Sequence, residues 1–415
     1  MSDTPHTVTL GCRLNSYESE RMARLAQEAG HPNAVIINTC AVTGEAVRQS
    51  RQAIRRAAKD RPGAPVYVTG CAAQLDPDAF AAMPQVTRVI GNGEKLTVKA
   101  WQTDGPVTDV FAETVLTKAP AALGPLTVRA HLEVQNGCNH RCTFCIIPFG
   151  RGQARSKASA DIVAEARAMA ESGAREIVLT GVDLTSYGPD LGEGVTLSDA
   201  IEALLAALPS SIRLRLSSID GAEVDERLFD LVTQEERIAP HLHLSLQAGS
   251  DMILKRMKRR HLRHDAIELC QRLKSARPDI AFGADLIAGF PTETDNMFAD
   301  TLSLVDECAL SFVHVFPFSP RAGTPAAKMP PVERTIVKAR AAELREKAHA
   351  ALSRHLSSKC GTQTTMLVES VRDGRLLGKA PDFTDITCSG PGAAGDLIRV
   401  HLIEANGGLM LAQTA

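Results

Sequence analysis

Three cysteines on one short segment are the strongest chemical signal in this sequence: Cys138, Cys142 and Cys145, in a C-x3-C-x2-C spacing. Three thiolates on a tight loop can hold three corners of a cubane iron–sulfur cluster and leave the fourth iron open. The amino and carboxylate groups of S-adenosylmethionine (SAM) can chelate that iron, and reductive cleavage then gives a 5′-deoxyadenosyl radical. Zinc is the alternative, with His140 as a fourth ligand, although zinc sites usually show paired cysteines.

Three further cysteines, Cys12, Cys40 and Cys71, share one local pattern. Each follows a short β-branched run, which predicts a buried parallel strand, and each precedes a helical pattern, at residues 16–29, 45–59 and 76–83. Because ligands bind beyond the carboxyl ends of parallel strands, the three thiols are expected to converge as a second metal-binding tripod. The alternative is three buried cysteines that pack as small hydrophobic residues.

A second series of strands and helices positions the first cysteine loop. The strands are predicted at residues 127–134, 176–181, 213–217, 241–247, 281–289 and 312–318, with helices between them, for example at 158–172, 197–208 and 264–276. Six such units predict a partial (β/α)6 barrel with its site at the C-terminal mouth. Alternation over 241–247 places polar side chains on one face, namely His241, His243, Ser245 and Gln247.

The last part of the chain has a different pattern. A long charged helix is predicted over residues 332–357, and the remainder is β-rich with turns at Asp373-Gly374 and Asn406-Gly407-Gly408. This pattern predicts a small antiparallel barrel of the oligonucleotide-binding kind. The expected fold class is therefore α/β, with an N-terminal parallel sheet at 1–117, a partial barrel at 126–355 and a C-terminal β-barrel at 356–415. The first boundary precedes the Pro/Gly-rich segment 119–125.

Composition limits the compartment and the cysteine chemistry. The chain has 415 residues, ten cysteines and a net charge of −2, from 46 basic and 48 acidic side chains. It has no apolar stretch long enough to span a membrane and no secretory signal pattern, which predicts a reducing cytoplasm without structural disulfides. Four later cysteines share no metal-like spacing and are expected to be structural: Cys270, Cys308, Cys360 and Cys388.

Several motifs resemble those of the radical-SAM methylthiotransferases. Residues 9–18, 38–43 and 69–74 are similar to the family's N-terminal cysteine motifs, and 142–152 to its SAM-cluster loop. Later strands at 179–183, 215–219, 244–247 and 285–291 are similar as well. The resemblance implies two [4Fe–4S] clusters: an auxiliary one on Cys12, Cys40 and Cys71, and one that binds SAM on Cys138, Cys142 and Cys145. It further implies SAM contacts from Phe144, near the adenine, and from Gly181, Asp183, Ser217, Gln247 and Gly289.

The family mechanism, as the resemblance implies it, uses both clusters, and no catalytic residue is assigned beyond their ligands. One SAM methylates a sulfur held at the auxiliary cluster, and a second SAM yields the radical that abstracts hydrogen from the acceptor carbon. The methylthio group is then passed to that carbon. An electron donor such as flavodoxin or ferredoxin is an expected partner.

Family members differ in acceptor: isopentenylated adenosine in tRNA, threonylcarbamoylated adenosine in tRNA, or an aspartate of a ribosomal protein. Residues 38–43, with Arg48 and Arg51 downstream, most resemble the threonylcarbamoyl branch. The sequence thus predicts methylthiolation at carbon-2 of N6-threonylcarbamoyladenosine at tRNA position 37, in the anticodon loop. DNA and membranes are not expected partners.

Two further features bear on tRNA. Basic segments at 48–61 and 255–263 are candidate footprints for phosphate. Val368-Glu369-Ser370, Asp373-Gly374 and Gly378 resemble the RNA-binding TRAM domain, from which residues 380–383 depart. A non-catalytic iron–sulfur protein that binds RNA is the alternative of another class.

Overall fold

The computed structural model describes residues 4–116 and 127–415. Its N-terminal part is a parallel sheet of order β1-β2-β3-β4. Every residue of β2 and β3 is buried, because α1 and α5 pack on one face and α2 and α4 on the other. The elements are β1 (His6–Thr9), α1 (Arg13–Glu28), β2 (Val35–Thr39), α2 (Gly44–Asp60), β3 (Val66–Gly70), α3 (Cys71–Leu75), α4 (Pro77–Ala81), β4 (Arg88–Val89), α5 (Val98–Gln102) and η1 (Val110–Ala112).

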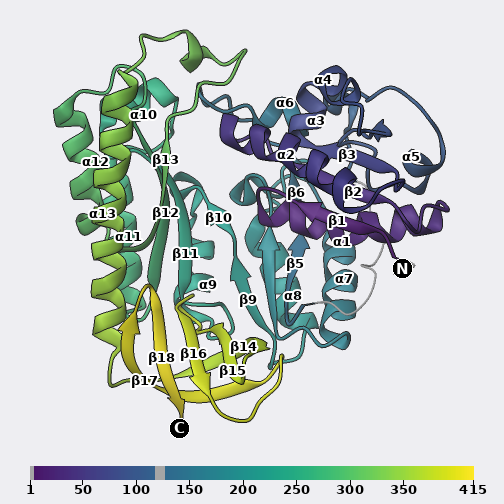
Figure 1. Cartoon of the computed structure of the whole chain (residues 1–415). Helices are drawn as coiled ribbons and strands as arrows, with labels where there is room; N and C mark the ends of the chain where they lie inside the picture. The colour runs from purple at the N-terminus through teal and green to yellow at the C-terminus, as the bar shows by residue number, and fades with distance from the viewer. Residues whose placement is uncertain (1–3, 117–126) are drawn as a thin grey trace.

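The central part is a partial barrel of parallel strands (Figure 1). One sheet has the order β5-β8-β9 and the other β10-β11-β12-β13, and Ser217 interrupts what is otherwise one strand, β9–β10. The strands are β5 (Arg129–Glu133), β8 (Glu176–Thr180), β9 (Arg213–Leu216), β10 (Ser218–Ile219), β11 (His241–Gln247), β12 (Ala281–Ala288) and β13 (Leu310–Pro317). The α/β fold with its six-unit barrel is confirmed.

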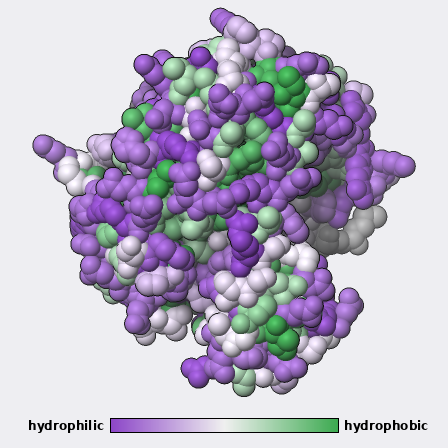
Figure 2. All heavy atoms as spheres, turned by 90° about the vertical axis from the view of Figure 1, so that its left-hand side faces the viewer, coloured by the Kyte–Doolittle hydropathy of each residue, from purple (hydrophilic) through white to green (hydrophobic). Residues whose placement is uncertain are grey.

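Helices cover the outside of this barrel, and α13 lies along β13 (Figure 1). They are α6 (Ile147–Arg151), α7 (Ser159–Glu171), α8 (Leu197–Ala207), α9 (Glu226–Gln234), α10 (Asp251–Met257), α11 (Arg263–Ala276), α12 (Asp295–Glu307) and α13 (Arg334–Lys359), with short turns η2 (Leu184–Ser186), η3 (Gly221–Glu223) and η4 (Pro325–Lys328). The α12–α13 side is mostly hydrophilic, with small separate hydrophobic patches (Figure 2). Within the described ranges, none of the helices has the length and apolar character that crossing a bilayer demands.

The C-terminal part is a closed barrel of order β14-β15-β16-β18-β17. Its strands are β14 (Gln363–Arg372), β15 (Arg375–Lys379), β16 (Asp385–Ser389), β17 (Leu397–Asn406) and β18 (Leu409–Thr414). The corner between β15 and β16 docks on the partial barrel: Arg215 donates from Nη2 to the Pro381 carbonyl at 2.8 Å, and Lys359 pairs with Asp382 at 2.8 Å. Residues 380–383, which depart from the TRAM resemblance, thus contact the partial barrel and the end of α13.

Some details differ from the sequence expectations. The helix expected at 76–83 is the short α4, and α3 already begins at Cys71. The antiparallel pair β6 (Gln135–Asn136) and β7 (Arg155–Ser156) was missed because two-residue strands show no periodicity. A bulge in β11 after Leu244 interrupts the regular alternation expected for Ser245 and Gln247. The expected first boundary at residue 117 and the segment 119–125 lie outside the described residues.

Candidate functional site

The three N-terminal cysteines come together at the carboxyl end of their sheet. Cys12 precedes α1, Cys40 follows β2, and Cys71 follows β3 directly. The Cys40 thiol interacts electrostatically with both Cys71 and Cys12. Two glycines allow this approach, both with positive φ: a Cβ on Gly11 would lie 2.9 Å from the Cys40 Sγ, and one on Gly70 would lie 2.4 Å from the Thr39 carbonyl oxygen.

The second cysteine group lies on the loop between β6 and α6. The Cys145 amide donates to the Cys142 carbonyl at 3.1 Å, and the Cys138 amide donates to the Gly152 carbonyl at 3.2 Å. Thr143 fastens the loop to α10, since its hydroxyl donates to the Arg256 carbonyl at 2.8 Å and its amide to the Met257 carbonyl at 3.1 Å. The loop is thus tight and closed at both ends.

The two cysteine groups share a boundary. Helix α6 begins two residues after Cys145 and packs on α3, where a Cβ on Gly150 would lie 3.3 Å from the Cys71 Cβ. Asn92 spans this boundary, because its amide donates to the Gly150 carbonyl at 2.5 Å and lies 3.8 Å from the Cys71 Sγ. The thiols of Cys71 and Cys145 also interact electrostatically. The two sites therefore face each other across α6.

A buried charge network fixes this boundary. Arg151, at the end of α6, donates to both carboxylate oxygens of Glu18 on α1, at 2.8 and 3.2 Å, and Lys95 pairs with the same carboxylate at 2.5 Å. All three side chains are at most 3% exposed. Burial alone would raise the pKa of Glu18, but the two cations outweigh it and lower the pKa to about 2.

Cations also surround the thiols. Arg151 interacts with Cys71 and Cys12, the Arg259 Nη1 lies 3.7 Å from the Cys142 Sγ, and Arg321 interacts with Cys40. Burial raises the pKa of Cys40 and of Cys145 to about 11, so a proton must leave each thiol when a metal binds. Soft sulfur donors in two groups of three, each beside fixed positive charge, fit iron–sulfur clusters well.

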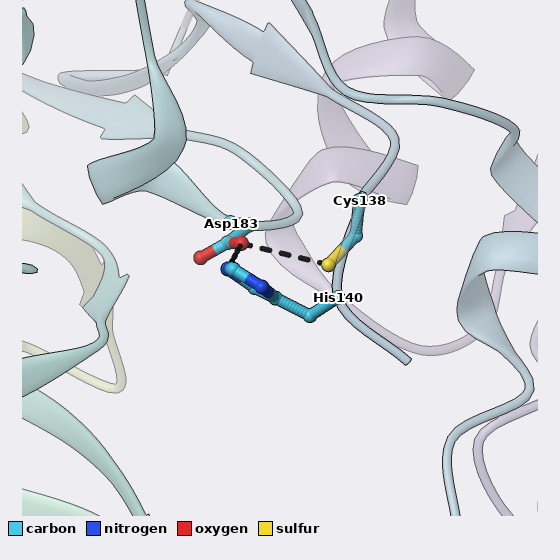
Figure 3. A group of neighbouring side chains, drawn as sticks. All are labelled: Cys138, His140 and Asp183. Carbon is cyan, nitrogen blue, oxygen red and sulfur yellow. Dashed lines mark hydrogen bonds and ion pairs between the residues drawn. The ribbon is translucent and has the colours of Figure 1, made fainter. Parts of the chain in front are cut away.

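His140 lies beside the cysteine loop, where its ring, the Cys138 Sγ and an Asp183 carboxylate oxygen offer ligand atoms within 4.8 Å of one another. Its Nε2 lies 2.8 Å from the Asp183 Oδ2 and 3.5 Å from a Glu223 oxygen, and Asp183 also contacts the Cys138 Sγ at 3.5 Å (Figure 3). Hydrogen bonds with Asp183 and Glu223 raise the pKa of His140 to about 9. A metal bound here would have to displace that proton, as it would the protons of the thiols.

The other predicted site residues surround the mouth of the barrel. Gly181 leaves room for Gln135, whose side-chain oxygen accepts from the amides of Val182 and Asp183 at 3.0 and 2.9 Å. Phe144 packs edge-on against Phe290, with ring centroids 6.4 Å apart. The remaining three lie at strand ends. The Ser217 hydroxyl is buried and makes no hydrogen bond to any described residue. Gln247 has a positive φ of 70°, and the Gly289 amide donates to the Glu293 carboxylate at 2.9 Å.

Inside the barrel, three side chains from adjacent strands form a polar array. The Asp285 Oδ1 lies 2.8 Å from the His243 Nε2 and 3.2 Å from the His314 Nδ1. Below them, His241 stacks on Phe383 at 4.7 Å. The lumen is therefore polar at the middle of the strands and closed by an aromatic ring at their N-terminal ends.

Both basic segments combine ion-paired cations with exposed ones. In the segment 255–263, Arg259 and Arg260 pair with Asp220 at 2.9 Å, and Arg263 pairs with Glu307. Lys255 and Lys258 of this segment are exposed and make no ion pair within the described ranges, so its role as a phosphate footprint stays a prediction. On α2, Arg48 is 61% exposed and pairs with Glu45, and Arg56 is 85% exposed and pairs with Asp60.

Comparison with known proteins agrees with these features. Residues 132–305 match the Radical SAM superfamily, and residues 4–91 match "Uncharacterized protein family UPF0004". A relative from Rickettsia prowazekii, named threonylcarbamoyladenosine tRNA methylthiotransferase MtaB, is 44% identical over 97% of this chain and 96% of its own. This chain belongs to the radical-SAM methylthiotransferase family.

Other relatives of this methylthiotransferase carry a different acceptor in their names. A protein of Erythrobacter litoralis, named tRNA-2-methylthio-N(6)-dimethylallyladenosine synthase, is 33% identical over 96% of this chain and 94% of its own. Among solved structures, the radical SAM methyltransferase TsrM from Kitasatospora setae superposes with a TM-score of 0.52 at 15% identity, covering 88% of this chain and 73% of that one. The latter likeness concerns the fold alone. Iron–sulfur clusters and SAM are the cofactors of the methylthiotransferase family, and the two thiol groups fit them.

Proposed function

We propose that this enzyme transfers a methylthio group to carbon-2 of N6-threonylcarbamoyladenosine at position 37 of tRNA. The observation that carries the chemistry is the meeting of two three-thiol sites across α6, at the mouth of a partial barrel. The acceptor is supported by full-length relatives that bear this activity in their names, at 44% identity in Rickettsia prowazekii and 34% in Aquifex aeolicus.

In this proposal each cysteine group holds one [4Fe–4S] cluster: Cys12, Cys40 and Cys71 the auxiliary cluster, and Cys138, Cys142 and Cys145 the cluster that binds SAM. When bound, the clusters would supply the electron and a site for sulfur, and SAM would supply the radical and the methyl group. Asp183 and His140 hold the rim of the second site in place through their ion pair. Of the predicted SAM contacts, Phe144, Ser217 and Gln247 have side chains at the mouth, whereas Gly181 and Gly289 act through their backbone.

The tRNA would approach from the mouth. The exposed guanidinium groups of α2 offer a basic surface for its phosphates, and the C-terminal barrel offers a second RNA-binding element. A base of the anticodon loop can be splayed out into the lumen, as is usual when a protein reads RNA. A small reduced protein such as flavodoxin or ferredoxin would deliver the electron, and the reaction would take place in the cytoplasm.

The test is nucleoside mass spectrometry of tRNA from a strain that lacks this gene. We expect 2-methylthio-N6-threonylcarbamoyladenosine to disappear and its unmethylthiolated precursor to accumulate. The wild-type gene should restore the product, and the matched variant Cys142→Ser should not. An unchanged product peak contradicts the proposal, and loss of the isopentenyladenosine product instead would reassign the acceptor.

A further inference from the structure

Arg13 is a partly buried cation without a counter-ion among the described residues. It follows Cys12 directly and is the first residue of α1. In the part of the chain that the structure describes, its guanidinium makes neither a hydrogen bond nor an ion pair, and its one direct contact is the Phe383 ring, 5.5 Å from centroid to guanidinium carbon. Burial, followed by nearby Arg129 and Arg215, lowers the pKa of Arg13 to about 10, so it stays charged at neutral pH.

The surroundings of Arg13 place it in the barrel lumen. It interacts electrostatically with Arg129 of β5, Glu176 of β8, Arg215 of β9 and Asp285 of β12. These four strands belong to both sheets of the barrel, so the guanidinium lies between them. The side chain thus occupies the space between the auxiliary cysteine site above and the Phe383 ring below.

The other charges in the lumen already have partners. The Arg215 Nε lies 2.7 Å from the Glu176 carboxylate, and Arg129 pairs with Glu369 at 3.2 Å. Asp285, which could have neutralised Arg13, instead accepts from both His243 and His314. Among these lumen arginines of the described ranges, Arg13 is therefore the one without a direct ion-pair partner, a position that an anionic ligand could fill.

We propose that Arg13 binds the carboxylate of the threonylcarbamoyl group and thereby makes the enzyme select an adenosine that bears a carboxylate. This inference rests on the proposed function. A guanidinium offers two parallel donors that match a carboxylate, and isopentenyladenosine has no group that could pair with it. Because Arg13 adjoins Cys12, an acceptor held by this contact lies beside the auxiliary site, from which the methylthio group comes.

The test compares two RNA stem-loops that differ only in this charge. One carries N6-threonylcarbamoyladenosine and the other its primary amide, which is neutral and of the same shape. Dissociation constants are measured by fluorescence anisotropy with the reconstituted holoenzyme in the absence of reductant, so that no turnover occurs. Wild-type enzyme should bind the acid about 10–100-fold more tightly than the amide, as expected for hydrogen bonds to a charged group.

Three variants test whether Arg13 is the residue that distinguishes the acid from the amide. Arg13→Gln should bring the acid-to-amide ratio close to one, and Arg13→Lys should keep part of it, because lysine retains the charge without the bidentate geometry. Arg24→Gln is the matched control, since Arg24 lies on the same helix, is 41% exposed and pairs only with Glu28. It should discriminate like the wild type. Iron content and visible absorbance are measured for each variant to verify that the site of Cys12 is retained.

The outcomes separate this inference from the proposed function. If wild-type enzyme methylthiolates the acid stem-loop but binds acid and amide equally, the inference is wrong and the function stands. If Arg13→Gln weakens acid and amide alike, Arg13 has a structural role, through its contact with Phe383, and the inference is also wrong. If wild-type enzyme with reductant does not methylthiolate the acid stem-loop, the proposed function itself fails.

Discussion

Cys138, Cys142 and Cys145 lie on one loop, whereas Cys12, Cys40 and Cys71 lie at the ends of elements that are far apart in the chain. The loop is fastened by hydrogen bonds from one threonine to α10. The dispersed group depends on a buried charge network that joins α1 to α6. Both regions present three thiols. The comparison shows that the same set of donor atoms can be assembled by neighbouring residues on one loop or by the folding of distant segments.

The largest expected effect separates the two sites by their chemistry. Cys142→Ser and Cys40→Ser should each lower the iron content of the reconstituted protein by about half, since each removes a ligand of one cluster. Formation of 5′-deoxyadenosine should stop in Cys142→Ser and persist in Cys40→Ser. Iron analysis and chromatography with SAM and reductant measure both quantities, and equal loss of 5′-deoxyadenosine in the two variants would contradict this division.

The next effect concerns the charge network at the dispersed site. Arg151→Gln leaves the buried Glu18 carboxylate with fewer partners, and breaking a buried ion pair costs about 3–5 kcal/mol of unfolding free energy. Arg48→Gln is the control, because the pair of Arg48 with Glu45 is exposed and should change stability by less than about 0.5 kcal/mol. Urea denaturation measures both, and equal losses would show that the network does not hold the site.

The same network should make stability depend on pH. The pKa of Glu18, lowered to about 2, lies below its unfolded value of about 4.3, so its contribution is full above that value and is lost as the pH falls through 2. The advantage of the wild type over Glu18→Gln in unfolding free energy should shrink by roughly 3 kcal/mol between about pH 5 and pH 2. Denaturation at several pH values tests this, and a constant difference would argue against the charged network.

The smallest effect is expected at the loop that carries Cys138, Cys142 and Cys145. Thr143→Val keeps the side-chain shape but removes the hydrogen bond to the Arg256 carbonyl, which should cost about 1 kcal/mol of unfolding free energy. The control is Thr103→Val, where the lost bond to the Lys99 carbonyl is exposed to water. A loss as large as that of Arg151→Gln would mean that the loop depends on tertiary contacts as strongly as the dispersed site does.

Prediction from sequence succeeded where the signal is local. The strand at 241–247 and the spacing of the cysteine loop can be read from adjacent residues. The pairing of Glu18 with Arg151 could not be, because no pattern links residues 133 positions apart. The same holds for the ion pairs of the basic segment 255–263, whose acidic partners Asp220, Glu223 and Glu307 are distant in the chain.

Arg13 shows a different limit. In the sequence it is one more basic residue beside a cysteine, and what singles it out is that no carboxylate of the described residues pairs with it directly. Such a deficit becomes visible only when the neighbours of every charge are known.

The ring of Phe383 also limits whether the C-terminal barrel of this enzyme can be exchanged for that of a relative. Cations from all three parts of the chain lie against it: Arg13, Arg129 and Arg215, and Lys379. The C-terminal barrel is therefore not an interchangeable module. In a chimera that takes this barrel from a relative, the barrel should dock as it does here only under two conditions. The relative must have an aromatic residue at the corner between β15 and β16, and the rest of the chimera must supply the cations around it.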